Sequence, residues 1–407
     1  MEAAGLRIAF VGVTTPMTLS ASTPVYFQNE DGEFIYDFMN DTTGEKLYDA
    51  VQKAVDDARE EGVDYVYLMA HLGENDSCSP WTYADVISHT NGIDVVLDGH
   101  SHDTDQAVVK NKDGEDVVRS AVGTKLNCIG YSFISLDDGT INTDIWSWPN
   151  KDCAADIMGL ENELTTAINA AMQELQERMG QVIANTSVDL TVNDPTATDD
   201  SGNPVRMVRR AETNMGDLCT DAFRQILGSD IAILNGGGIR TGIPEGDITF
   251  ENIMDVFPFG NQTDVIEATG QQILDALEWG ARVVPDETGA FLQVSGLSYE
   301  IDTTIPSTCT QDENGMFTGV SGDRRVKNVK VGEDPIDPNA TYTVGSIDYV
   351  LINHGDGQTA FDGCSVVKSM VMLDNQLLID YLTETLGGTV GDDYEDPTGQ
   401  GRISIQE

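Results

Sequence analysis

The chain has 407 residues, of which 40% are hydrophobic, and its 69 acidic and 22 basic residues give a formal net charge of −47. This length allows two hydrophobic cores of ordinary size, so we expect two domains. The acidic excess argues against nucleic acid and anionic lipid as partners, because the surface repels both within the Debye length. No stretch of about 18 apolar residues occurs, so we expect no membrane span.

The first part of the chain predicts alternating strands and helices. Apolar residues three or four positions apart indicate a helix that ends at Gly62, and short β-branched and aromatic runs indicate strands. This alternation favours a largely parallel sheet, followed by two strands that we expect to be antiparallel because their turns are short. The expected elements are strands at 7–13, 63–71, 93–102, 117–124 and 128–136 and helices at 44–62 and 81–92.

The second part predicts a separate α/β domain. A long helix at 157–179 carries apolar residues along one face, and the polar, proline-containing stretch 189–204 follows it. We expect three domain regions: residues 1–152, a linker helix at 153–185, and residues 186–407. Within the last, we expect helices at 214–227 and 269–284, a strand at 230–235 and a helix entry at 249–261.

Three histidines fall at the ends of predicted strands. His71 ends one strand, and His100 and His102 end another. Because ligands bind at the carboxyl ends of parallel strands, all three side chains can point into one crevice. Neutral imidazole is the commonest metal ligand, but a single histidine is more often an ordinary polar residue. His89 is expected on a helix surface, and we assign it no role.

A glycine turn follows the strand at 230–235. "NGGGIR" lets backbone N–H groups face an anion, and Arg240 offers a planar fork suited to phosphate oxygens, although the glycines could simply turn the chain. The six cysteines form no C-x-x-C pair. Their state stays open between free thiols and one or two disulfides.

Several blocks resemble the secreted 5′-nucleotidase family, in the same order and over nearly the whole chain. "LRIAFVGVTTP", "VYLMAHLG" and "GIDVVLDGHSHDT" resemble the later half of that family's metallophosphoesterase domain. "ETNMGDLCTDAF", "ILNGGGIRTGIPEGDITFENIMDVFPFGN", "FLQVSGL" and "NHGDG" resemble its C-terminal nucleotide-binding domain. The implied fold is a partial α/β/β/α metallophosphoesterase sandwich, joined by a long helix to an α/β 5′-nucleotidase C-terminal domain.

The resemblance implies two divalent metal ions, of zinc, manganese, magnesium or calcium, with His71, His100 and His102 among their ligands. Such a pair clamps phosphoryl oxygens and acidifies a bound water. The family also uses D-x-H, G-D-x-x-D and G-N-H-E blocks. Here the only D-x-H is Asp98-Gly99-His100, and the other two blocks do not occur. We therefore expect incomplete metal ligation and an inactive chain when alone, through N-terminal truncation rather than through loss of catalysis.

The resemblance also implies a nucleotide grip in the second domain. Arg209 and Arg240 would hold the phosphate. Asn235 would form a hydrogen bond with the base, and Phe259 would stack on it. Asp356 would accept hydrogen bonds from the ribose hydroxyls. The family's second aromatic plate corresponds to Val350, so Tyr349 would supply that ring or one face would stay unstacked. The complete set of expected substrate-binding residues is Arg209, Asn235, Gly237, Gly238, Arg240, Phe259, Asn261, Tyr349 and Asp356.

The sequence therefore predicts hydrolysis of nucleotide phosphate esters to nucleoside and phosphate by the complete enzyme, with a nucleotide as its partner. Two alternatives stay open. One is a noncatalytic nucleotide-binding module, and the other is a 2′,3′-cyclic-nucleotide phosphodiesterase or nucleotide-sugar hydrolase on the same scaffold. The family implies an extracytoplasmic location, although the chain shows no signal peptide.

Overall fold

The computed structural model describes the whole chain except residues 30–32, 75–77, 148–162, 199–203 and 407. It divides into two compact units. Unit 1 comprises Met1–Leu19 and Gln28–Ile168, and unit 2 comprises Ser20–Phe27 and Asn169–Glu407. The division falls inside helix α5 (Glu163–Met179), within the region where the sequence predicts the linker helix. Residues 157–162 of that predicted helix lie outside the described residues.

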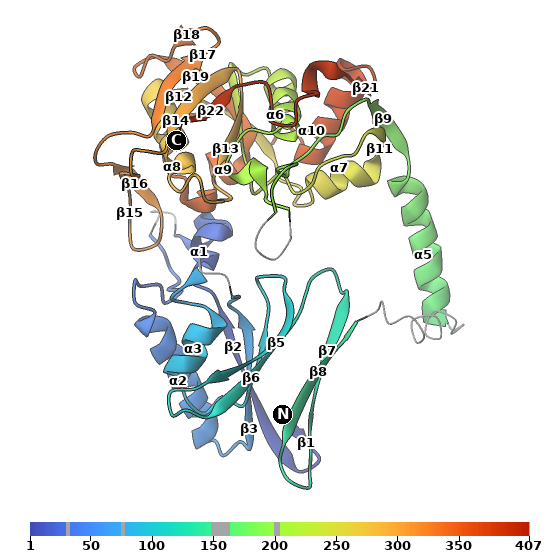
Figure 1. The fold of residues 1–407 in the computed structure, drawn as a ribbon, viewed down its shortest axis with the longest axis vertical. Helices are drawn as coiled ribbons and strands as arrows, with labels where there is room; N and C mark the ends of the chain where they lie inside the picture. Colours follow the sequence, from blue (N-terminus) through green and yellow to red (C-terminus); the bar gives the residue numbers. More distant parts are fainter. Residues whose placement is uncertain (30–32, 75–77, 148–162, 199–203, 407) are drawn as a thin grey trace. The chain divides into compact units, whose positions relative to one another are not determined.

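Unit 1 is built on a six-stranded sheet with the order β1-β2-β3-β4-β6-β5. Helices α2 and α3 cover one face of this sheet, and the β7–β8 hairpin lies on its other side (Figure 1). The elements are β1 Glu2–Ala3, β2 Leu6–Thr14, α1 Thr18–Ala21 (at the division), α2 Glu45–Glu60, β3 Tyr65–His71, α3 Tyr83–His89, β4 Val95–Asp98, β5 Thr104–Lys110, β6 Asp116–Val122, β7 Cys128–Ile134 and β8 Ile141–Ser147.

The predicted parallel sheet is present, with one difference in pairing. Strands β2, β3, β4 and β6 are mutually parallel, so β6 is not the antiparallel addition that the sequence predicts. The reason is β5, a strand without a clear sequence signal, which pairs antiparallel with β6 and brings the chain back parallel to β4. On α2, the buried residues Leu47, Val51 and Val55 follow the predicted helical spacing and pack into the core of unit 1.

Unit 2 contains a five-stranded sheet with the order β13-β10-β19-β12-β20, in which only β10 and β19 pair in parallel. Helix α6 packs on β10 and β13, and α8 packs on β12 and β17. The helical elements are η1 Pro24–Phe27, η3 Met207–Arg209, α6 Asn214–Leu227, α7 Phe250–Val256, α8 Gly270–Ala281, α9 Asp348–Leu351, η4 Gly355–Gly357, α10 Asp374–Asp380, η5 Tyr381–Thr385 and η6 Asp392–Tyr394.

Smaller sheets complete unit 2, with the orders β11-β9-β21, β18-β17-β14-β22 and β15-β16. The strands of unit 2 are β9 Val182–Thr186, β10 Ile231–Asn235, β11 Gly246–Thr249, β12 Thr263–Thr269, β13 Leu292–Ser295, β14 Leu297–Asp302, β15 Cys309–Gln311, β16 Phe317–Val320, β17 Val326–Val331, β18 Asp334–Pro335, β19 Thr341–Ile347, β20 Ser365–Lys368, β21 Thr389–Val390 and β22 Ile403–Gln406.

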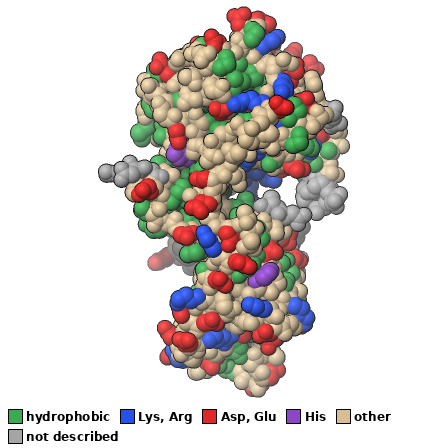
Figure 2. All heavy atoms as spheres, turned by 90° about the vertical axis from the view of Figure 1, so that its left-hand side faces the viewer, with side chains coloured by type: hydrophobic (Ala, Val, Ile, Leu, Met, Phe, Trp, Pro, Cys, Tyr) green, Lys and Arg blue, Asp and Glu red, His purple; other side chains and the backbone are tan. Residues whose placement is uncertain are grey.

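Three general properties of the chain can be checked against the structure: its surface charge, the state of its cysteines and its lack of a predicted membrane span. Aspartate and glutamate side chains are spread over the face drawn in Figure 2, as the large negative net charge requires. Among the described residues, Cys128, Cys219, Cys309 and Cys364 are free thiols, whereas Cys153 lies outside those residues. Among the helices that the structure describes, none combines the length and the apolar character needed to cross a membrane.

Candidate functional site

The carboxyl ends of β3 and β4 bring two of the predicted histidines together. The ring centroids of His71 and His100 lie 5.0 Å apart in an edge-to-face arrangement. Gly99 permits this approach, because a Cβ there would stand 3.2 Å from Nδ1 of His71. Gly73 adopts a φ of 76° beside them, and a Cβ on it would meet the His100 ring at 3.0 Å. Gly73 and Gly99 therefore make room for the imidazoles.

A buried ion pair supports the loop that carries His71. The Asp98 carboxylate at the end of β4 accepts hydrogen bonds from the backbone N–H groups of Leu72 (2.9 Å) and Gly73 (3.2 Å). Arg119 on β6 is fully buried and donates to Asp98 at 3.0 Å and also to Asp103. Because removal of one partner of a buried pair leaves an unpaired charge, we expect loss of either Arg119 or Asp98 to destabilise these strand ends. No sequence motif pointed to Arg119.

The histidines fit part of a metal site. Burial, with the adjacent His71, lowers the pKa of His100, which favours the neutral imidazole that binds metal. None of the described residues forms a hydrogen bond with the rings of His71, His100 or His102, so their nitrogens are available. His102 is exposed, with a φ of 62°. However, the described residues contain no group of three or more potential ligands that could hold a metal ion.

In unit 2, the parallel pair β10 and β19 brings Asn235 and Asp356 to one sheet edge. Asn235 ends β10, and Asp356 follows β19 and α9 in the chain. The Asn235 Nδ2 group donates to Oδ2 of Asp356 at 2.9 Å. Oδ1 of Asn235 is buried and has no hydrogen-bond partner among the described residues, so it remains able to accept. Burial raises the pKa of Asp356, while Asn235, Arg282 and Arg209 oppose that rise.

The glycine turn after β10 packs against a second backbone. The N–H of Gly236 donates to Phe291 O (2.7 Å) and that of Gly237 to Gly289 O (2.9 Å). A Cβ on Gly237 would lie 3.0 Å from Cα of Gly289, and one on Gly238 would lie 2.8 Å from Oδ1 of Asn235. These N–H groups are therefore used within the fold. The glycines let two chain segments approach closely beside Asn235.

The two predicted phosphate-binding arginines, Arg209 and Arg240, are free of carboxylate partners among the described residues, whereas Arg206 pairs with Glu287 at 2.8 Å. Burial, with the positive charges of Arg206 and Arg240, lowers the pKa of Arg209 to about 10. Guanidinium groups that repel one another and form no close ion pair with a carboxylate are suited to an anion.

Phe259 and Asn261 follow α7 but differ in their surroundings. The Phe259 side chain is 61% exposed, and the Arg240 guanidinium lies 5.6 Å from its ring centroid. An exposed ring is free to stack on a planar ligand. Asn261 is engaged within the fold, because its Nδ2 donates to the Asp374 carboxylate at 2.9 Å. The sequence resemblance gave no sign of that partner.

The Tyr349 ring packs beside Gly355, and its hydroxyl accepts a hydrogen bond from the N–H of Asp356 at 3.1 Å. Val350, at the position of the family's second aromatic plate, is buried. Two further residues near Asp356 escaped the sequence reasoning. Trp279 donates from Nε1 to the Asp356 carbonyl at 3.0 Å, and Arg282 stacks on Trp279 at 3.7 Å.

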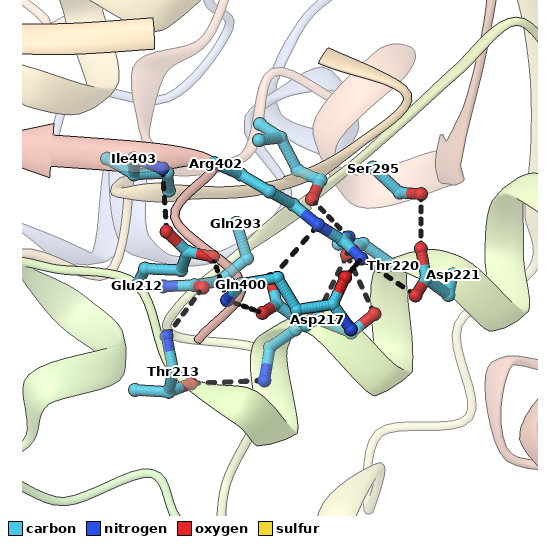
Figure 3. A network of polar contacts seen from close by, with 12 residues as sticks. Glu212, Thr213, Asp217, Thr220, Asp221, Gln293, Ser295, Gln400, Arg402 and Ile403 are labelled. Carbon is cyan, nitrogen blue, oxygen red and sulfur yellow. Dashed lines mark hydrogen bonds and ion pairs between the residues drawn. The ribbon is translucent and has the colours of Figure 1, made fainter. Parts of the chain in front are cut away.

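A polar network joins the start of α6 to the segment before β22 (Figure 3). The N–H of Gln400 donates to Glu212 (2.7 Å) and to Asp217 (2.8 Å), and Arg402 donates to Asp221 (2.8 Å). Burial, reinforced by the neighbouring Glu212 and opposed by Arg402, raises the pKa of Asp217 to about 8. Part of the "ETNMGD" motif is therefore structural.

Comparisons with known proteins show similarity in sequence to nucleotide-hydrolysing enzymes. Residues 182–363 match the family described as 5′-nucleotidase, C-terminal domain. The chain is 29% identical over 421 residues to the trifunctional nucleotide phosphoesterase protein YfkN of Bacillus subtilis, covering 99% of this chain and 25% of that protein. It is 24% identical to the cell wall protein Lmo0130 of Listeria monocytogenes, covering 94% of this chain and 47% of that protein.

A solved structure, that of a 5′-nucleotidase precursor from Thermus thermophilus, matches the whole chain and 74% of its own length, with a TM-score of 0.69 and 27% identity. The α/β fold of the chain is therefore similar to that of this 5′-nucleotidase precursor. Residues 182–363 are similar to a 5′-nucleotidase C-terminal domain, and nearly the whole chain is similar in sequence to part of the Bacillus phosphoesterase. The chain spans 25% of the length of the Bacillus relative and 47% of that of the Listeria relative.

Proposed function

We propose that this chain supplies the nucleotide-binding part, and some of the metal ligands, of a hydrolase that cleaves nucleotide phosphate esters to nucleoside and phosphate. One observation carries the proposal. Arg209 and Arg240, free of carboxylate partners among the described residues, belong to the same unit as the linked pair Asn235 and Asp356, within the region that matches the 5′-nucleotidase C-terminal domain. An anion-binding group and a hydroxyl-accepting carboxylate together suit a nucleoside phosphate.

Each side chain has a task in this proposal. Arg209 and Arg240 neutralise and orient the phosphate. The Asp356 carboxylate accepts the ribose hydroxyls, and the open Oδ1 of Asn235 accepts an N–H of the base. The exposed Phe259 ring stacks on one face of the base, an interaction of about 1 kcal/mol.

We further propose that His71, His100 and His102 are ligands of divalent metal ions. When bound, such ions polarise the phosphate and acidify a water molecule. The adjacent rings of His71 and His100 and the lowered pKa of His100 support this assignment. Because the described residues gather no three-ligand group, we propose that carboxylate ligands come from a polypeptide segment outside these 407 residues.

The second candidate is nucleotide binding without turnover, which the same lack of a three-ligand group within the described residues favours for this chain taken alone. A phosphate-release assay on nucleoside monophosphates with added manganese or zinc separates the two. We expect no turnover by the 407-residue chain and turnover once the missing ligands are supplied. Brisk turnover by the chain alone would contradict its proposed incompleteness.

The binding proposal is tested by calorimetric titration with adenosine monophosphate and with adenosine. Arg209→Gln should weaken binding of the monophosphate at least about tenfold, since a hydrogen bond to a charged group is lost, and leave adenosine unaffected. Arg206→Gln is the matched control, because that guanidinium already pairs with Glu287. Equal losses in both variants, or no binding by the unsubstituted chain, would refute the assignment.

We also propose an extracytoplasmic location. The similarity to the Listeria cell wall protein supports this location, as does the acidic surface. Fractionation of cells that express the protein tests the location, and recovery in the cytoplasm alone would contradict it.

A further inference from the structure

The backbone of Asp356 is held in an unusual conformation. Its φ of 55° and ψ of 22° lie in the left-handed region, which is uncommon for residues other than glycine. The preceding His354 is also left-handed, with a φ of 57°. A conformation of this kind persists only where neighbouring groups enforce it, so the contacts of Asp356 determine where its carboxylate points.

Three side chains hold Asp356, each by a different atom. The Tyr349 hydroxyl accepts its N–H at 3.1 Å, Trp279 Nε1 donates to its carbonyl at 3.0 Å, and Asn235 donates to its carboxylate at 2.9 Å. The aspartate is therefore fixed at both ends of its backbone and at its side chain.

The two aromatic residues are themselves fixed. A Cβ on Gly355 would stand 2.2 Å from the Tyr349 ring, so only glycine leaves room for the hydroxyl to reach Asp356. Trp279 is only 2% exposed, and Arg282 both stacks on its ring at 3.7 Å and donates to its carbonyl at 2.8 Å. Gly289 faces the carboxylate, because a Cβ there would lie 3.3 Å from Oδ1.

From these contacts we propose that Tyr349 and Trp279 are positioning residues that aim the Asp356 carboxylate and thereby make the site selective for a sugar with vicinal hydroxyls. Tyr349 then acts through its hydroxyl and not as a ring stacked on the base. This inference rests on the proposed function, since it concerns the aspartate assigned to the ribose. It extends that function, because two residues that need not touch the ligand determine which sugar is accepted.

The test compares adenosine monophosphate with its 2′,3′-dideoxy analogue in calorimetric titrations of the full chain. Tyr349→Phe keeps the ring and removes the hydroxyl. We expect this substitution to weaken the binding of adenosine monophosphate about tenfold and to leave the affinity for the dideoxy analogue unchanged. Asp356→Asn should have the same two effects. The double substitution should weaken binding no more than either single change, because the two residues act as one unit.

Tyr342→Phe is the matched control. Its hydroxyl also accepts a backbone N–H, that of Asp337 at 3.0 Å, but on β19 away from Asn235 and Asp356. It should not alter either affinity. Suppose that Tyr349→Phe lowers both affinities equally or changes neither, while Asp356→Asn weakens only the binding of adenosine monophosphate. The positioning role is then refuted, and the proposed function stands. If the unsubstituted chain binds neither probe, both proposals fail.

Discussion

Replacing Asp217 with asparagine should remove a pH-dependent component of the stability of unit 2. Asp217 and Glu212 are both almost fully buried, and both accept from the N–H of Gln400. Two carboxylates on one donor repel each other, so the folded state favours a proton on the pair. Burial first, and Glu212 in addition, raise the pKa of Asp217 from 3.8 to about 8.

The sign and size of the effect follow from linkage. Between about pH 4 and about pH 8 the folded state holds a proton that the unfolded state lacks, so the free energy of unfolding falls as the pH rises. A difference of one proton corresponds to about 1.4 kcal/mol per pH unit. Integrated from about pH 6 to about pH 8, where the folded group begins to ionise, the loss is about 2 kcal/mol. Asparagine resembles the protonated acid but does not titrate, so the variant should not show this pH-dependent loss of stability.

The assay is urea denaturation of the original chain and of Asp217→Asn from about pH 5 to about pH 9, compared at each pH so that contributions common to both proteins cancel. The variant should gain about 2 kcal/mol relative to the original chain between about pH 6 and about pH 8. Asp334→Asn, at an exposed strand end, removes the same formal charge and should change stability by less than about 0.5 kcal/mol. If the free energy of unfolding of Asp217→Asn and of the original chain changes with pH in parallel, the proposed proton on the Asp217–Glu212 pair is refuted.

Three further outcomes are expected. Phe223→Ala should lower the free energy of unfolding by about 3–5 kcal/mol in urea denaturation, because the ring is fully buried in the core of unit 2. Phe259→Ala should leave stability unchanged because the ring is exposed. It should weaken the binding of adenosine monophosphate about fivefold in calorimetry, because stacking of the ring on the base contributes about 1 kcal/mol. His71→Ala should weaken zinc or manganese binding in equilibrium dialysis, whereas His89→Ala, an exposed residue stacked on Tyr48, should not.

Local patterns predicted the elements of this fold well. The sequence predicted α6 at 214–227, where the structure has it, and a β-branched and aromatic run put His71 at the end of β3. Such signals work because helical and strand periodicity depend on neighbouring residues. The pairing of β6 with β4 could not be predicted in this way, since the pairing depends on β5, whose polar sequence carries no clear strand pattern.

The candidate site likewise combines residues that the sequence predicted with contacts that it could not predict. Residue-by-residue resemblance identified Asn235 and Asp356, which the structure joins by a hydrogen bond. It could not identify Trp279, because the interaction of this residue with Asp356 spans 77 positions and uses a backbone carbonyl, which leaves no mark in the sequence. Nor could it show that Asn261 is engaged by Asp374.

The closing contacts of unit 2 have a consequence for its biosynthesis. Glu212 receives its hydrogen bonds from the N–H groups of Gln400 and Ile403, which lie 188 and 191 positions later in the chain. During vectorial synthesis, Glu212 and Asp217 therefore leave the ribosome well before the backbone donors that they bind in the folded protein. Unit 2 can reach its native state only after translation of β22, so a nascent chain halted before that strand should remain sensitive to protease.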